Sequence, residues 1–452
     1  MSLPGTSTHK KRHPKGLPVL FLTEMWERFS FYCMLSILSL YMIEHNIGGG
    51  LGFSNDKTSQ IYGLYVGLVY FTPFLGGIIA DKIFGIRKTI IIGGLFMMAG
   101  HFLLAFRPLP FFFSALCCLI IGNGCFKPNI SVMLGNLYRD MPEKKDDAYN
   151  IFYMGINVGA LFSPLVAAYL RSLHPIHGWH YAFAAAGVGM IISLITFLMF
   201  QKHVRAGENI SDSNESQMDQ EVQLTPQQAR KRITALLVIF GAVIFFWMAF
   251  HQNGLTLTFW ARDATDTTLS PELFQSVNPF FVLAFTPLLV GFWNFLRRRK
   301  FEPSTAAKLG IGMLLTAGCY AIMASAAFAG GNAGRVSVSW LISAYAVITM
   351  GELCLSPMGL SLVSKLAPWK IRGMMMGGWF AATAIGNYLS GLLGSFWDNW
   401  QHSTFFIVLV VTSLFAAALL FFLLKFLNPV ITEAEQQAEE LAAKMEAKPK
   451  PL

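Results

Sequence analysis

The sequence predicts an all-α integral membrane protein with twelve transmembrane helices. The chain is 54% hydrophobic and only 13% charged, whereas a soluble domain carries about 25% charged residues. Its apolar residues lie in unbroken runs such as "FFIVLVVTSLFAAALLFFLL", without the alternation of a membrane β-barrel. Such runs favour helices, which satisfy their own backbone hydrogen bonds in lipid.

Twelve apolar stretches are long enough to span a membrane, because a helix needs about 20 residues to cross the hydrocarbon core. They are residues 18–43, 59–81, 88–106, 110–137, 148–171, 181–201, 233–259, 273–296, 305–328, 337–364, 371–396 and 403–427.

The Lys and Arg residues predict the orientation, since they favour cytoplasmic connections. With a cytoplasmic N-terminus, the outer connections receive few of the 34 Lys and Arg. Those few are Lys57, Arg107, Arg171, Arg262 and Arg335. We therefore expect both termini in the cytoplasm and a multi-pass protein of the cell inner membrane. The net charge of +9 then reflects topology and predicts no nucleic-acid partner.

A polar connector that contains "RAGENISDSNESQMDQEVQ" divides the predicted spans six and six. The two halves are similar in sequence. "VYFTPFLGG" in the first half resembles "LAFTPLLVG" in the second, and "GNGCFKP" resembles "GELCLSP". Two similar six-helix halves are typical of a transporter that rocks about a central site. Two bundles are predicted, an N-terminal one at 18–201 and a C-terminal one at 233–427. The remaining parts are cytoplasmic: an N-terminal segment at 1–17, a linker at 202–232 and a tail at 428–452.

The first predicted span carries Glu24, Glu27 and Arg28 on one helical face. Lys127, in the fourth span, is the only other cation that lies away from the ends of a span. A charge at mid-membrane costs about 2.5–3.5 kcal/mol on insertion scales, so such residues usually face a functional cavity. An ion-pair lock that only joins two helices is the structural alternative. We interpret these four residues as a proton switch.

Glu352 is a third charged site, in "ITMGELCLSPMGLS". Gly351 and Pro357 flank it, so we expect the helix to open locally there. A cavity with cations from one half and this carboxylate from the other suits a small zwitterion. The alternative is a protonated glutamate that makes a hydrogen bond between two helices.

Four motifs are specific when taken together. "EMWER" matches the pattern E-x-x-E-R, and "FYMGINVGAL" matches F-Y-x-x-I-N-x-G-[SA]-L. "GCFKPNIS" carries a fourth-helix lysine, and "GGIIADKIFGIRK" is similar to a cytoplasmic loop between helices two and three. In this order and spacing, the sequence resembles the proton-dependent oligopeptide transporters of the major facilitator superfamily.

The resemblance implies a major facilitator fold and the import of di- and tripeptides with protons by alternating access. It implies that Arg28 and Lys127 hold the peptide carboxylate, that Glu352 receives the amine, and that Glu24 and Glu27 carry protons. The other implied substrate-binding residues are two backbone-binding amides and four aromatic residues that line pockets, namely Asn157, Asn278, Tyr32, Tyr65, Trp247 and Trp379.

The sequence departs from the family pattern in "FFWMAFHQNG", where His251 replaces a common glutamate. We expect His251 to face Arg28 and to act as a proton-coupling residue, with a neutral hydrogen-bond partner as the alternative. Phe31 and Leu35 also differ from residues that the family often has.

Other functions stay open at this stage. One fold serves many substrates, so the chain could export, or could move another small anion such as nitrate, which has no use for Glu352. A non-transporting peptide receptor is a further alternative. No nucleotide-binding loop or nucleophile motif is present, so we expect no enzyme and no cofactor. We also expect no metal site. We do expect the protein to contact membrane lipid and to function as a monomer.

Overall fold

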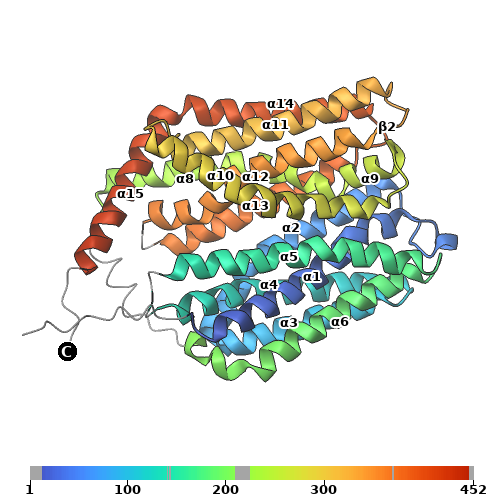
Figure 1. The fold of residues 1–452 in the computed structure, drawn as a ribbon, viewed down its shortest axis with the longest axis horizontal. Helices are drawn as coiled ribbons and strands as arrows, with labels where there is room; N and C mark the ends of the chain where they lie inside the picture. The colour runs from blue at the N-terminus through green and yellow to red at the C-terminus, as the bar shows by residue number, and fades with distance from the viewer. Residues whose placement is uncertain (1–12, 140, 142–143, 209–223, 369–370, 447–452) are drawn as a thin grey trace, which may run out of the picture.

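The computed structural model describes residues 13–139, 141, 144–208, 224–368 and 371–446, which are almost entirely helical (Figure 1). The first six helices are α1 Gly16–Ile43, α2 Asn55–Ile79, α3 Ile86–Leu104, α4 Leu109–Leu137, α5 Lys145–Ser172 and α6 Gly178–Met199. The later helices are α8 Pro226–Phe250, α9 Thr256–Asp263, α10 Val277–Arg298, α11 Thr305–Ala329, α12 Val338–Leu366, α13 Arg372–Gly394, α14 His402–Phe422 and α15 Leu424–Glu446. Short 3-10 or π turns are η1 Asn46–Gly48, η2 Ala80–Phe84, η4 Gln201–His203, η5 Arg205–Glu208, η6 His251–Gly254 and η7 Pro271–Ser276. Two short strands, β1 Thr265–Asp266 and β2 Val336–Ser337, pair in parallel.

Each of the twelve predicted stretches contains a long helix. Within the described residues, ten helical segments are long and apolar enough to cross a membrane. The other two are α13 and α1, and α1 carries the charged residues Glu24, Glu27 and Arg28. The prediction of an all-helical membrane chain is therefore confirmed, while the count of twelve spans stays a prediction.

Local chemistry explains where several helices begin. Ser54, Thr225 and Ser304 each accept a hydrogen bond from a backbone N–H of the first helical turn. Thr225 and Gln228 form a complete capping box, and Pro226 follows directly. Because of this cap, α8 starts seven residues before the predicted position 233.

The seventh predicted stretch, 233–259, is not one helix. It breaks after Phe250 into the 3-10 turn η6, and α9 then resumes at Thr256. Leu255, with φ −125° and ψ −95°, lies outside helical geometry at this break. The break contains Gly254, whose missing side chain leaves room for the Tyr62 hydroxyl.

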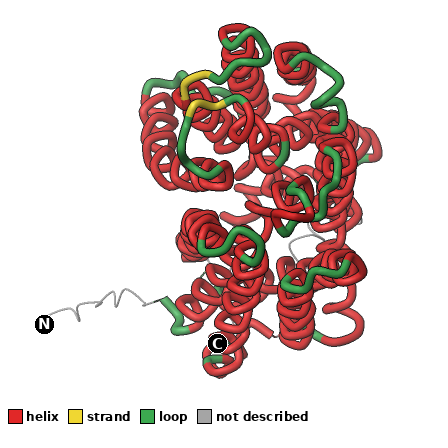
Figure 2. The backbone as a smooth tube through the Cα atoms, turned by 90° about the vertical axis from the view of Figure 1, so that its right-hand side faces the viewer, coloured by secondary structure: helices red, strands yellow, loops and turns green. Residues whose placement is uncertain are grey.

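The long helices form two groups, a first half from α1 to α6 and a second half from α8 to α14 (Figures 1 and 2). In the first half α1 packs against α5 and α6, and α3 packs against α4. In the second half α11 packs against α12 and α14, and α8 packs against α13. Between the halves, α2 packs along α13, and α5 contacts α10 and η7. The helix α15 contacts α8, α11 and α12 at the end of the molecule where the described chain ends (Figure 1).

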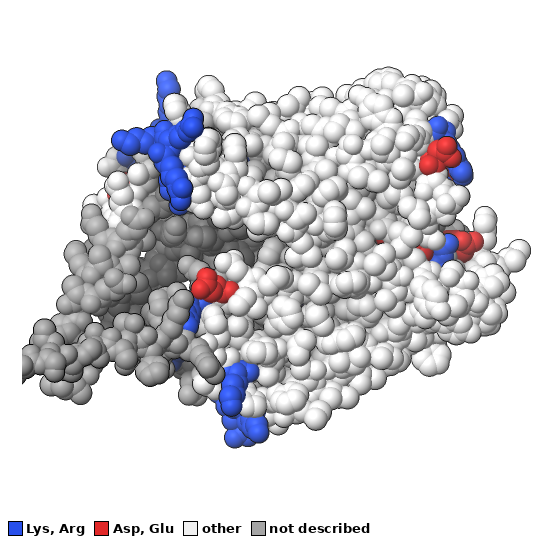
Figure 3. Space-filling view, in the orientation of Figure 1, with Lys and Arg blue, Asp and Glu red and all other residues white. Residues whose placement is uncertain are grey.

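Charged side chains gather at the two ends of the helices on the face shown in Figure 3, and a broad band between them is free of Lys, Arg, Asp and Glu. A charge-free band along the helices is what a lipid-facing surface requires.

Hydrogen bonds join the two halves at the end opposite to α15, which we call the sealed end. The bonds are 2.8–3.0 Å long. The pairs are Asn55 with Asp398, Ser39 with the Gly254 carbonyl, Gln275 with the Ser36 carbonyl, Ser276 with the Leu161 carbonyl, and Arg171 with Glu272.

Candidate functional site

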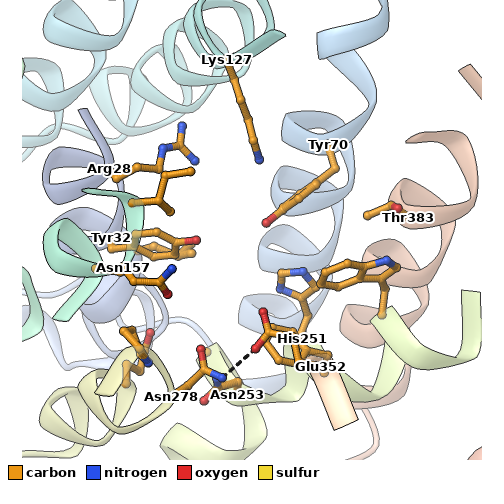
Figure 4. Close-up of a pocket in the computed structure, with 18 of the residues that line it drawn as sticks. Arg28, Tyr32, Tyr70, Lys127, Asn157, His251, Asn253, Asn278, Glu352 and Thr383 are labelled. Carbon is orange, nitrogen blue, oxygen red and sulfur yellow. Dashed lines mark hydrogen bonds between the residues drawn. The ribbon is translucent and has the colours of Figure 1, made fainter. Parts of the chain in front are cut away.

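A cavity of about 350 Å³ lies between the halves, with walls from α1, α2, α4 and α5 on one side and α8, α10, α12 and α13 on the other. Most of the residues predicted to bind substrate line it. They are Arg28, Tyr32, Lys127, Asn157, Trp247, Asn278, Glu352 and Trp379, and the proton-coupling candidate His251 lines it as well (Figure 4).

The first half contributes a buried ionic network. Arg28 donates through Nε and Nη2 to both carboxylate oxygens of Glu27, and its Nε lies 3.4 Å from Glu24 Oε1. Arg28 Nη2 also donates to Asn123 Oδ1 at 3.0 Å. All three charged residues are at most 2% exposed. Two carboxylates thus surround one guanidinium, and the network is one positive charge short of neutral.

Lys127 supplies that charge from α4. Its ammonium lies 4.5 Å from the ring centroid of Tyr70, and the described residues place no carboxylate within ion-pair distance of it. Figure 4 shows the side chain pointing into the cavity between Arg28 and Tyr70. The ammonium is therefore available to an anionic group in the cavity.

The second half contributes Glu352. Its Oε2 accepts a hydrogen bond from Asn278 Nδ2 at 2.9 Å, and the same amide donates to Thr349 Oγ1 at 2.9 Å. The expected opening of the helix at this point is wrong, because α12 is continuous from Val338 to Leu366. Gly351 instead permits close packing, since a Cβ there would lie 2.9 Å from the Gly312 carbonyl oxygen of α11.

His251 does not contact Arg28, contrary to the expectation from the sequence. Its ring lies 5.4 Å from the ring of Tyr70 and 5.4 Å from that of Trp247, measured between centroids. Figure 4 shows Arg28 on the other side of the cavity. Tyr70 of α2 takes the neighbouring position, and His251 itself is the first residue of the 3-10 turn η6 that follows α8.

Three predicted residues lie outside the cavity lining. Glu24 and Glu27 are buried behind Arg28. Tyr65 is 2% exposed, and its hydroxyl has no hydrogen-bond partner among the described residues. Asn157 does line the cavity, where its amide donates to the Tyr153 carbonyl one turn earlier in α5.

The sequence reasoning missed several polar residues of the site: Tyr62, Tyr70, Asn123, Tyr153, Asn253, Gln275 and Thr383. Asn123 could have been found, because it precedes Lys127 by four residues in "GNGCFKP" and so shares its helical face. Asn253 carried no such signal, since it lies in the break after α8.

Apolar helices that enclose a charged cavity between two halves define a multi-pass membrane transporter. A profile of the POT family matches residues 87–222 and 208–413. The peptide transporter YePEPT of Yersinia enterocolitica is 33% identical over 451 residues, 84% of this chain and 88% of that protein. A di-/tripeptide transporter of Lactococcus lactis subsp. cremoris is 31% identical, over 82% of this chain and 86% of that one.

A solved POT family transporter in complex with a thioalcohol conjugated peptide superposes with a TM-score of 0.83 at 28% identity. The superposition covers 93% of this chain and 97% of that chain. The chain therefore belongs to the POT family, a transporter family and not an enzyme family, and the resemblance predicted from the motifs is confirmed.

Proposed function

We propose that the chain imports di- and tripeptides together with protons by alternating access. One observation carries this proposal. The cations Arg28 and Lys127 of the first half face the Glu352 carboxylate of the second half across one cavity (Figure 4). A peptide carries an anionic carboxylate and a cationic amine, so its two ends match the two sides of this cavity. The named relatives, which are peptide transporters, support the same substrate class.

The contacts suggest how a peptide binds. Lys127 has no carboxylate partner in the described residues, so it holds the peptide carboxylate first. Arg28 is engaged by Glu27 and Glu24, and it becomes free for the peptide when either acid takes a proton. Peptide binding and proton uptake then stabilise each other, which is the requirement for coupling. Asn278 orients Glu352 toward the amine.

The sealed end supports alternating access, because hydrogen bonds join the two halves at one end of the cavity. With both termini in the cytoplasm, this conformation faces inward. We further propose that the chain has twelve membrane spans in two bundles, joined by a cytoplasmic linker at 202–232. The protein would lie in the cell inner membrane, contact lipid and function as a monomer.

The hydrogen bond between Glu352 and Asn278 favours a substrate with an amine over a simple anion such as nitrate. An exporter or a non-transporting receptor would use the same cavity, so transport itself must be measured.

The test is uptake of a radiolabelled dipeptide by proteoliposomes under an inward proton gradient. We expect accumulation only with the gradient, competition by unlabelled dipeptide and little competition by its N-acetyl form, because an ion pair that loses one partner weakens by about 2–5 kcal/mol. Lys127→Ala should abolish accumulation, while Lys425→Ala, an exposed lysine of α15, should not. Binding without accumulation would identify a receptor, and equal competition by the acetylated peptide would contradict the role of Glu352.

A further inference from the structure

Three polar atoms on the second half's wall of the cavity have no hydrogen-bond partner among the described residues. They are Trp247 Nε1, His251 Nε2 and Asn253 Oδ1. All three residues line the cavity, and Trp247 and His251 are each only 8% exposed. Buried polar groups are nearly always paired in folded proteins, so three such atoms at one wall indicate a ligand-binding role.

The three residues are adjacent because of the break after α8. Trp247 and His251 are four residues apart, and their rings are tilted by 31° at a centroid distance of 5.4 Å. Asn253 follows two residues later in η6, where the chain leaves helical geometry. The three atoms are one obligate donor, one obligate acceptor and one imidazole nitrogen that can serve as either.

The chemistry of this wall suits an uncharged ligand group. The rings of Tyr70, Trp247 and Phe250 contact His251, and none of them is ionic. The carboxylate of Glu352 is engaged by Asn278, and the Lys127 ammonium lies over the Tyr70 ring. A hydroxyl or a carboxamide carries both a donor and an acceptor, and it can satisfy the wall without bringing a charge.

We propose that Trp247, His251 and Asn253 form a subsite for a neutral hydrogen-bonding side chain on the first residue of the peptide. This rests on the proposed function. The position follows from Figure 4, in which His251 and Asn253 lie beside Glu352 and Asn278, and Arg28 and Lys127 lie across the cavity. A peptide whose amine is at Glu352 places its first side chain at this wall. The chain therefore selects peptides that begin with Ser, Thr, Asn or Gln.

The experiment compares near-isosteric dipeptides as competitors for uptake in proteoliposomes. Thr-Ala against Val-Ala and Asn-Ala against Leu-Ala differ mainly in hydrogen-bonding capacity. We expect the polar member to compete about twofold to tenfold better for each hydrogen bond that it gains. Ala-Thr against Ala-Val should show no such preference, because the second side chain lies elsewhere.

The decisive variant is Trp247→Phe, which removes the indole N–H and keeps a ring. It should lower the polar-to-apolar ratio by about the twofold to tenfold that one hydrogen bond contributes, while Val-Ala still competes. Trp260→Phe is the matched control, because Trp260 Nε1 is also unpartnered and buried but does not line the cavity. That control should leave the ratio unchanged.

Asn253→Ala provides a second variant in case Trp247→Phe does not fold, and it should lower the same ratio. Equal competition within each pair by the unmutated protein, or a preference that survives both variants, would overturn the subsite. Absence of any peptide uptake would instead overturn the proposed function, so the two failures are distinguishable.

Discussion

The two lateral seams between the halves are built in different ways. Along one seam, α2 lies against α13 in the most extensive contact between the halves. Glycines allow this approach, since a Cβ on Gly63 would lie 2.6 Å from the Gly391 Cα. Farther along the same seam, a Cβ on Gly377 would lie 2.9 Å from the Phe74 ring. The α2–α13 seam is therefore closely packed over most of its length.

The other seam, between α5 and α10, is held mainly at the sealed end. There Arg171 Nη1 donates to both oxygens of Glu272 at 2.8 and 3.0 Å, and Ser276 donates to the Leu161 carbonyl. Only 11% of the apolar stretch within Pro271–Arg298 is buried, against 44% within Asn55–Phe84, which contains α2. The α5–α10 seam thus consists of polar contacts at one end, made by Arg171, Glu272 and Ser276, and a helix that is mostly exposed. We call these polar contacts the clasp.

The difference indicates which seam moves more. A dry contact between glycine-lined helices opens only if it separates along its whole length, whereas a polar clasp can exchange its hydrogen bonds for water. We therefore expect the α2–α13 seam to act as a pivot and the α5–α10 seam to open and close as a gate. The predictions below test this assignment in order of expected effect.

The largest effect is expected for Arg171→Ala. The Glu272 side chain is 0% exposed, so loss of its partner leaves a buried carboxylate without compensation, which costs about 3–5 kcal/mol in the sealed conformation. The equilibrium should then shift at least tenfold toward a conformation that is open at this end. Spin labels on Leu173→Cys and Leu269→Cys, with the exposed Cys117 replaced by Ala, would report a longer distance between the halves.

Arg262→Ala is the matched control for this experiment. Arg262 belongs to the same end of the molecule, but it pairs with its neighbour Asp263 within the second half. It should leave the distance distribution unchanged. An identical distribution for Arg171→Ala would show that the clasp does not hold the gate.

A second prediction concerns the pivot. In Gly391→Ala the new Cβ would lie 2.3 Å from the Ser59 carbonyl oxygen, and overpacking of this kind costs about 1–3 kcal/mol. We expect lower thermal stability in detergent and slower uptake. Gly291→Ala, on α10 of the gate seam, meets no atom within 4 Å and should keep both properties. Equal behaviour of the two variants would remove the distinction between the seams.

A third prediction asks whether the pivot side also carries proton coupling. His251 follows α8, which packs against α13, and its ring lies beside those of Tyr70 and Trp247 in the lining of the cavity. We expect His251→Gln to keep peptide counterflow but to bring concentrative uptake to within about twofold across pH 5.5–7.5. If the pH profile and accumulation are unchanged, coupling rests on Glu24 and Glu27 and not on His251.

The smallest effect is expected at Glu302, beyond the end of α10. Hydrogen bonds from Arg297 and Lys308, at 2.6 Å each, lower the pKa of Glu302 to about 2. This stabilisation is complete above the ordinary pKa of 4.5 and is lost as the pH falls toward 2. Because Arg297 is 66% exposed, Glu302→Gln should lower the free energy of unfolding by less than about 1 kcal/mol at pH 7. The difference from the unmutated protein should shrink at pH 3, and a difference that grows there would contradict the assignment.

The sequence alone predicted the features that depend on neighbouring residues. Hydropathy located a long helix in each of the twelve predicted stretches, because a run of about 20 apolar residues can be recognised from neighbouring residues alone. The spacing of Glu24, Glu27 and Arg28 predicted one charged face for the same reason. The motifs identified the family and, through it, several of the residues that line the cavity.

Only the tertiary structure decided how these helices are rotated and where they meet. Asn123 binds Arg28 across 95 positions of sequence, and Tyr70 occupies the place beside His251 that we had assigned to Arg28. Tyr65 does not line the cavity although Tyr62, three residues earlier, does. Such choices follow from packing between helices, because hydropathy and motifs describe each helix separately. The sequence by itself therefore determined the membrane-spanning helices and the charges of the site, whereas packing decided which side chains share the cavity and which seam is close-packed.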